Sequence, residues 1–260
     1  MTQLPPPPPP AGPPAGAPPP PPPPAPLPPP PAAVARWRDQ RGLTLALVIC
    51  FGILVTTCVV LVVALANRLS VVADVRNGNF TNILARAQDA DDFVSGANAA
   101  FLLVQLLLAV LFITWNFRAA KNNEALDRRN PRFAPGWAIG GWFIPIANLV
   151  IPVMLLQDLW RGATPEIPRG DPTWRRARGA VLIGIWWAVW LLSFARIFAG
   201  SSRVDDRASL DSIETSNWVA LVGVVVAAVA AVLAVFVVRA LAQRQLETLR
   251  AQRDAYDALA

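Results

Sequence analysis

The chain has 260 residues, of which 54% are hydrophobic and only 15% charged, a balance that ordinary soluble domains do not show. Its formal net charge is +6, but the 22 arginines and the single lysine flank apolar runs instead of gathering on one face, which argues against nucleic-acid binding. Histidine is absent, so the commonest general base and most zinc sites are excluded. These observations indicate a polytopic membrane protein.

The N-terminal segment, residues 1–35, is rich in proline. Twenty of the first 31 residues are proline. Such a segment cannot build a hydrophobic core and favours the extended polyproline II conformation. We expect a disordered tail, and two interpretations of it stay open. It is either a spacer or a strip that docks into an aromatic groove of a cytoplasmic protein partner.

Four apolar blocks, at about 43–66, 97–117, 179–201 and 217–238, form a predicted membrane domain within residues 36–241. Each block is close to the roughly 20 residues that a membrane-spanning helix needs. Arg196 is the one ionisable residue well inside a block, which makes it a functional candidate by default. Because it lies near the end of its block, we expect it to reach water or an acidic loop instead. A helical tail, 242–260, follows.

The stretch 132–160 is apolar enough to enter a membrane but is too broken to cross it as one helix. It carries no charge from 133 to 157, yet three prolines and a Gly-Gly pair interrupt it. Irregular backbone survives at membrane depth only where protein or a water-filled cavity covers it. Its polar residues are Asn148, Gln157 and Asp158. They are candidates for a ligand site, or they satisfy backbone groups left unpaired near the prolines.

The distribution of basic residues predicts how this stretch is placed. If it enters the membrane and returns, the segments 1–42, 118–132, 161–178 and 239–260 share one side and hold 17 basic residues, against 5 in 67–92 and 201–216. The positive-inside rule then puts both termini in the cytoplasm. We therefore predict an all-α bundle of four transmembrane helices plus a proline-broken re-entrant or interfacial segment at 133–160. Five transmembrane helices is the alternative.

Local signals predict where two of these helices end or begin. The second helix is expected to run beyond the membrane until Asn130-Pro131 stops it. Asp171-Pro172 has the character of an N-cap followed by a first-turn proline, so the third spanning helix is expected to begin there.

A set of aromatic, basic, amide, glycine and proline residues around the broken stretch carries a resemblance to a known family: Trp115, Arg118, Asn122, Asn123, Pro135, Gly136, Trp137, Trp142, Pro145, Asn148, Pro152 and Trp160. With these residues the chain resembles the domain of unknown function 4328 family, which consists of bacterial, largely actinobacterial, polytopic membrane proteins. The resemblance covers roughly residues 43–241. Members often carry an aromatic and a basic residue where this chain has Val150-Ile151. The family has no established activity, so the resemblance implies a membrane architecture and no catalytic residues.

The sequence contains no phosphate loop, metal-ligand spacing or nucleophile motif, so we expect neither an enzyme nor a cofactor. Two hypotheses for its function remain. The first is a scaffold in the bacterial plasma membrane whose proline-rich tail recruits a cytoplasmic protein. The second is a small transporter or ligand-binding module with a site around Asn148 and Asp158. The expected partners are the lipid bilayer and that cytoplasmic protein, and a homo-oligomer is left open.

Overall fold

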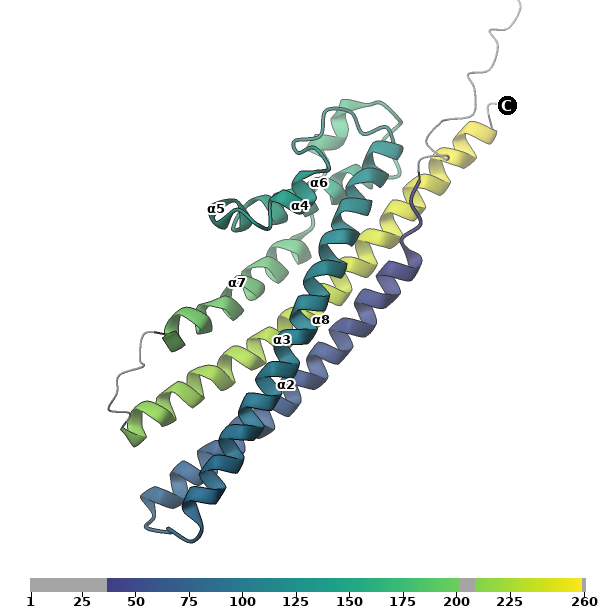
Figure 1. Ribbon diagram of the computed structural model, residues 1–260. Coiled ribbons are helices and arrows are strands. Elements are labelled where there is room, and N and C mark those ends of the chain that lie inside the picture. The colour runs from purple at the N-terminus through teal and green to yellow at the C-terminus, as the bar shows by residue number, and fades with distance from the viewer. Residues whose placement is uncertain (1–36, 202–208, 259–260) are drawn as a thin grey trace, which may run out of the picture. The chain divides into compact units, whose positions relative to one another are not determined.

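The computed structural model describes residues 37–201 and 209–258, and for residues 195–201 it describes the backbone alone. All regular structure in these residues is helical, as predicted (Figure 1). The proline-rich tail predicted for 1–35 lies outside the described residues, and its conformation stays a prediction.

Four long helices dominate the described chain: α2 (Arg41–Arg76), α3 (Ile83–Ala125), α7 (Val181–Ser201) and α8 (Leu210–Asp257). By length and composition α2, α3 and α8 are able to cross a membrane. The described apolar part of α7, Val181–Phe194, is shorter. An all-helical membrane protein is therefore confirmed with three candidate spans, one fewer than the four expected.

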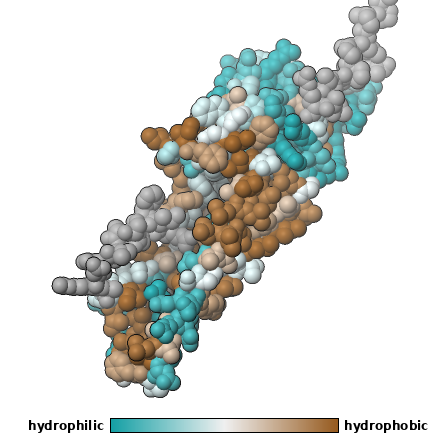
Figure 2. Space-filling model, viewed as in Figure 1, coloured by the Kyte–Doolittle hydropathy of each residue, from teal (hydrophilic) through white to brown (hydrophobic). Residues whose placement is uncertain are grey.

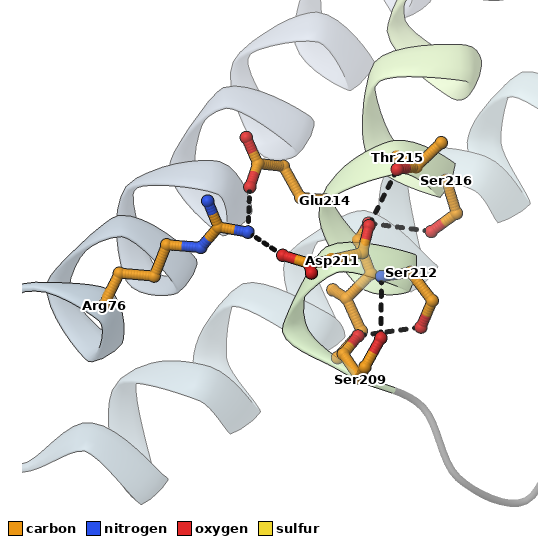
Figure 3. A network of polar contacts seen from close by, with 8 residues as sticks. Arg76, Ser209, Asp211, Ser212, Glu214, Thr215 and Ser216 are labelled. Atoms are coloured by element: carbon orange, nitrogen blue, oxygen red, sulfur yellow. Dashed lines mark hydrogen bonds and ion pairs between the residues drawn. The ribbon is translucent and has the colours of Figure 1, made fainter.

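The long helices pack as a row in the order α3, α2, α8, α7. Helix α2 contacts both α3 and α8, and α8 contacts α7, whereas α3 and α7 make no backbone contact with each other in the described residues. The Gln40 side chain at the start of α2 donates a hydrogen bond to Gln245 of α8 at 3.0 Å. At the opposite end, Arg76 of α2 pairs with Asp211 and Glu214 at the start of α8 (Figure 3). Helices α2 and α8 are therefore antiparallel.

The two ends of this row differ in charge. We call the end that contains residues 37–42, 118–132, 161–178 and 239–258 the basic end, and the end that contains 67–92 and 209–216 the acidic end. At the acidic end the Ser209 hydroxyl caps α8 by accepting from the Ser212 N–H at 3.3 Å (Figure 3). The negative charge of Asp211, in the first turn, interacts favourably with the positive end of the helix dipole.

Each long helix buries one stripe and leaves other apolar side chains exposed. On α2 the buried stripe includes Leu47, Leu54 and Leu61, a spacing that keeps side chains on one helix face. On α3, Leu103 and Val110 are 67% and 64% exposed. Figure 2 shows the resulting broad hydrophobic surface along the middle of the long helices. A surface of this kind indicates contact with lipid.

The broken stretch folds into three short helices: α4 (Trp137–Gly140), α5 (Pro145–Asn148) and α6 (Ile151–Gly162). Helix α6 has 12 residues and the other two have 4 each, all too short to cross a bilayer. The stretch also returns to the end where it started. Gly170 donates its N–H to the Asp127 carbonyl, and the Trp174 indole donates to the Arg129 carbonyl, each at 3.1 Å. Five transmembrane helices find no support in this geometry.

Two helix boundaries differ from the prediction. Helix α3 ends at Ala125, five residues before Asn130, and Asp127 then adopts a left-handed φ of 55°. The reason is tertiary, because the turn points Arg128 into the protein. Asp171 does cap a helix, accepting from the Thr173 N–H at 2.8 Å, but that helix is the short 3-10 helix η1 (Pro172–Arg176). Helix α7 begins separately at Val181.

The helical tail is part of the bundle and is not free. Helix α8 continues without a break to Asp257, and Gln245, Thr248 and Gln252 are buried on one of its faces. Gln252 donates to the Leu126 carbonyl at 3.4 Å, just beyond the end of α3. The part of the tail up to Gln252 therefore binds its own chain.

Candidate functional site

Two neighbouring amides of α3 hold the basic end together. Asn122 makes two hydrogen bonds with the backbone of one residue, accepting from the Arg38 N–H at 2.9 Å and donating to the Arg38 carbonyl at 3.0 Å. Asn123 accepts from the Gln245 side chain at 3.0 Å and donates to the Asp158 carbonyl at 3.4 Å. Both amides are buried and are occupied by the protein itself. Their position indicates a structural role.

Arg128 has a similar role that the sequence analysis missed. Only 2% of this residue is exposed, and its guanidinium donates to four carbonyls, one at the last residue of α6 and three in the loop that follows, at 2.7 to 3.0 Å. Burial lowers the pKa of the Arg128 guanidinium from its ordinary value, although arginine remains protonated in proteins. The four acceptors are the carbonyls of Gly162, Thr164, Ile167 and Pro168.

Close packing accompanies this network at Gly162. A Cβ at Gly162 would lie 2.2 Å from Asn123 Nδ2, so a side chain at this position would displace the amide. The glycine is therefore required for α6 to approach the end of α3.

Gln157 fastens α6 to the start of α7. Its amide donates to the Ala180 carbonyl at 2.8 Å and accepts from the Ala180 N–H at 2.9 Å. The amide therefore uses both its donor and its acceptor function on the backbone of Ala180, which indicates a structural role.

Asp158 is buried beside arginines. Its Oδ1 accepts from Arg161 at 3.2 Å, whereas Oδ2 lies 3.8 Å from Arg132 Nε and has no hydrogen bond in the described part of the chain. Burial raises the pKa of the Asp158 carboxyl, and the positive charges of Arg132, Arg161 and Arg175 oppose that effect. The adjoining cavity, lined also by Asn123 and Trp174, measures about 20 Å³. That volume holds about one water molecule and no larger ligand.

The tryptophans of the signature join different elements. Trp115 donates to Thr44 Oγ1 of α2 at 3.1 Å. Trp160 lies under the Arg244 guanidinium, 4.7 Å from its ring centroid. Trp142 packs edge-on against rings of α3 and α7 at 5.7 to 6.0 Å, and the cluster so formed comprises Phe112, Trp142, Trp187 and Trp190.

The other signature residues shape the broken stretch. Pro145 and Pro152 occupy the first turns of α5 and α6, where a missing N–H costs no helical hydrogen bond. Pro135 lines the water-sized cavity. Gly136 and Trp137 are exposed at the start of α4.

Two arginines complete the set of predicted site residues. Arg118 is half-buried near the basic end of α3. Arg196 belongs to α7, but its side chain lies outside the described residues, so its expected role stays a prediction.

A cavity of about 620 Å³ lies between α3 and α7. It exists because these two helices pack on different neighbours, and because the α8 side chains beneath it are small. The broken stretch closes one end of the cavity with Trp142, Phe143 and Asn148. The α8 residues in its floor are Ala227, Ala230, Ala231 and Ala234.

The mouth of this cavity is apolar. Phe143, at 73% exposure, and the exposed Leu102, Leu106 and Phe194 lie among its lining residues. These side chains belong to the same hydrophobic surface that indicates lipid contact. The cavity therefore opens sideways towards the bilayer.

Uncharged amides are the accessible polar groups of the cavity. Asn98 and Gln105 lie seven residues apart on α3, and both line it. Neither amide has a hydrogen-bond partner among the described residues. Ser193, by contrast, donates to the Trp190 carbonyl at 2.6 Å. An unpaired amide in hydrocarbon costs several kcal/mol, on the order of a lost hydrogen bond or more.

Further unpaired atoms lie in the cavity wall, since Asn148 Oδ1 and Trp186 Nε1 are buried without a partner in the described chain. The structure therefore separates the residues that the sequence placed in one site. Asn148 lines the large cavity, Asp158 the water-sized one, and Gln157 neither.

Asn98 and Gln105 were not predicted as site residues, because within apolar runs only ionised side chains were taken as candidates. Their spacing of seven residues within an uncharged run was the available signal, since it places both amides on one helix face. Among the described residues no group of His, Cys, Asp or Glu side chains is arranged to hold a metal ion.

Three helices able to cross a membrane, with a broken segment folded back at one end, define an α-helical membrane protein. The sequence model of the domain of unknown function DUF4328 matches residues 81–243, more than half of the chain, and the chain belongs to that family. The match contains α3, the broken stretch, α7 and most of α8, and begins later than the residue 43 suggested by the resemblance. No curated protein and no solved structure matches the chain.

Proposed function

We propose that this chain is a plasma-membrane protein that binds an apolar ligand, drawn from the bilayer, in the cavity between α3 and α7. The observation that carries the proposal is the cavity itself. Its volume of about 620 Å³ lies within the roughly 300 to 1,000 Å³ of small-molecule sites. This proposal keeps the ligand-binding hypothesis and Asn148, but moves the site away from Asp158.

The proposal includes four transmembrane helices with α7 as the third. Its 21 residues extend about 32 Å at 1.5 Å per residue, enough for a hydrocarbon core of about 30 Å. By the positive-inside rule the basic end is cytoplasmic. A bacterial membrane follows from the character of the family that the chain resembles.

Photolabelling tests the cavity. The purified protein, reconstituted in lipid, is exposed to hexadecane that carries a terminal diazirine, and the labelled residues are mapped by mass spectrometry. We expect labels on Leu108, Phe112 and Trp190, which line the cavity. The variant Ala231→Phe fills the floor and should abolish these labels without unfolding the protein, because the added ring enters empty space.

The matched control is Val232→Phe, which adds similar bulk to the exposed side of α8. It should leave the labels in place. Equal labelling of Ala231→Phe and the control, or labels spread evenly over all lipid-facing residues, would show that the cavity binds no ligand.

A second candidate function is the scaffold. Residues 37–40, which join the proline-rich tail to α2, are held at the basic end through Arg38 and Asn122. The described chain therefore begins at the basic end, which is the proposed cytoplasmic side. Since α8 binds its own chain up to Gln252, the proline-rich segment is the better candidate for recruiting a partner.

Crosslinking in membranes followed by pull-down tests this second function. A partner protein should be recovered with the complete chain and lost after deletion of residues 1–35, whereas deletion of residues 254–260 should have no effect. Retention of every partner after the first deletion would remove the scaffold from consideration.

A further inference from the structure

We infer that the cavity between α3 and α7 accepts a neutral, lipid-like molecule with one long apolar chain and a hydroxyl or carbonyl group. The polar group of the ligand lies at Gln105 and Asn98, and its apolar chain lies against the aromatic cluster. This inference rests on the proposed function and names the class of ligand.

The charge of the lining argues for a neutral ligand. Its described residues are apolar, aromatic or uncharged polar side chains, and none is ionised. An ionised group brought into such surroundings would lose its hydration and find no counter-charge. The described wall of the cavity therefore selects against charged molecules.

The amides argue for a hydrogen-bonding group on the ligand. A glutamine side chain both donates and accepts, and Gln105 does neither within the described chain. It is half-buried and lies in the second apolar block, which in the proposed topology crosses the membrane. A hydroxyl complements both functions of the amide and a carbonyl complements its donor, whereas a plain hydrocarbon leaves both unpaired.

The distribution of lining residues orients the ligand. On α3 the lining extends from Asn98 to Ile113, which is about 22 Å along the helix axis at 1.5 Å per residue. Asn98 lies at the end of the lining nearer the acidic end, and Gln105 lies near its middle. Phe112, Trp142 and Trp186 occupy the part nearer the basic end. The half nearer the basic end thus holds most of the aromatic rings of the lining together with Asn148, whereas Asn98 and Gln105 lie along the rest of the α3 wall.

The route of entry follows from the same geometry. Trp142 packs against Trp190 at 5.8 Å and against Phe112 at 5.7 Å, which closes the end that faces the broken stretch. The exposed Leu102 and Leu106 lie along the opening on α3. A molecule dissolved in the bilayer therefore enters sideways, and a water-soluble molecule has no comparable path from the basic end.

Three photoreactive probes with the diazirine at the same chain position test the inference: hexadecanol, hexadecane and, at trace concentration, hexadecyl sulfate. In the reconstituted complete chain, hexadecanol should label the cavity more strongly than the other two. Gln105→Leu should reduce labelling by hexadecanol about three- to thirtyfold, the range expected for one hydrogen bond in a membrane, and leave labelling by hexadecane unchanged.

Two further variants complete the design. Thr114→Val removes a hydroxyl from the exposed side of α3, outside the cavity, and should change nothing. Gln105→Asn keeps an amide and should restore part of the preference for the alcohol. Because Gln105→Leu removes an unpartnered amide from apolar surroundings, it should fold at least as well as the parent protein.

The outcomes separate this inference from the proposed function. If the alcohol-to-hydrocarbon ratio is the same in Gln105→Leu and the parent, while Ala231→Phe still abolishes labelling, the cavity binds a ligand but the inferred polar recognition is wrong. Preferential labelling by hexadecyl sulfate would overturn the inference that the ligand is neutral. Absence of cavity labelling by every probe would overturn both.

Discussion

At the residue scale, the described polar side chains divide into those that hold the fold together and those that lack a partner within the described chain. Arg128, Asn122 and Gln157 donate hydrogen bonds to backbone carbonyls of distant segments. Gln105 forms no hydrogen bond with the described chain. A buried polar group without a partner is costly, so the second class is where a ligand is sought.

Arg128→Met should be among the most damaging single substitutions, because it leaves four carbonyls without their donor. We expect a loss of about 3 kcal/mol or more in the free energy of unfolding. Thermal unfolding in detergent measures it. The neighbouring Arg129→Met is the control, since its exposed ion pair with Asp127 contributes about 1 kcal/mol at most. Equal losses for the two variants would contradict the role assigned to Arg128.

Asp158 predicts a pH dependence. Because burial raises the pKa of its carboxyl, the folded protein binds this proton more tightly than the unfolded chain does. Stability should therefore increase as the pH falls through the raised pKa and reach its full gain below the ordinary value. In Asp158→Asn the melting temperature should change less between neutral and mildly acidic pH than it does in the parent protein. An unchanged pH profile in that variant would show that another group titrates.

At the element scale, short segments are positioned by single side chains. Helix α7 starts at Val181 and not at Pro172 because Gln157 pairs with both backbone groups of Ala180. Helix α3 stops at Ala125 because the following turn buries Arg128. In both cases a contact between segments distant in sequence overrides a valid local signal.

Gln157→Leu should loosen the start of α7. Two buried backbone groups lose their partner, so we expect a cost of about 2 to 4 kcal/mol and faster hydrogen exchange of the amides around residue 180. Gln88→Leu, at an exposed position of α3, is the control. Protection around residue 180 that survives Gln157→Leu would mean that other contacts position α7.

At the scale of the whole molecule, the row of helices leaves a cavity because the backbones of α3 and α7 make no contact in the described residues, and the two helices meet only through side chains such as Phe112 and Trp186. The contacts between residues 127–129 and 162–174 also place both flanks of the broken stretch at one end of the row. If α2, α3, α7 and α8 cross the membrane, both flanks therefore share a side.

Cysteine labelling tests that topology. Arg129→Cys and Arg176→Cys are exposed at the basic end, and Asn79→Cys is exposed at the acidic end. Native Cys50 and Cys58 are buried and should contribute little background. An impermeant maleimide should reach position 79 in whole cells and positions 129 and 176 only in inverted vesicles. Labelling of 129 and 176 from opposite sides would refute the shared side.

Much of the fold was predictable from local information. Apolar runs of about 20 residues predict membrane helices because burial of backbone polar groups in lipid leaves few other structures. The prolines and the charge asymmetry predicted that 133–160 folds back. The boundaries at Ala125 and Val181 were not predictable, since they depend on Arg128 and Gln157 contacting residues more than twenty positions away.

The sequence by itself determined the membrane class, the location of the apolar helices and the unusual character of the broken stretch, because hydrophobicity, proline and charge act locally. Only the tertiary structure decided which polar residues are occupied and which are free. It paired Gln157 with backbone, enclosed Asp158 beside a space for one water, and exposed Gln105 to a cavity of about 620 Å³. Hydrogen-bond partners and empty volume depend on how helices pack, and no local pattern contains that information.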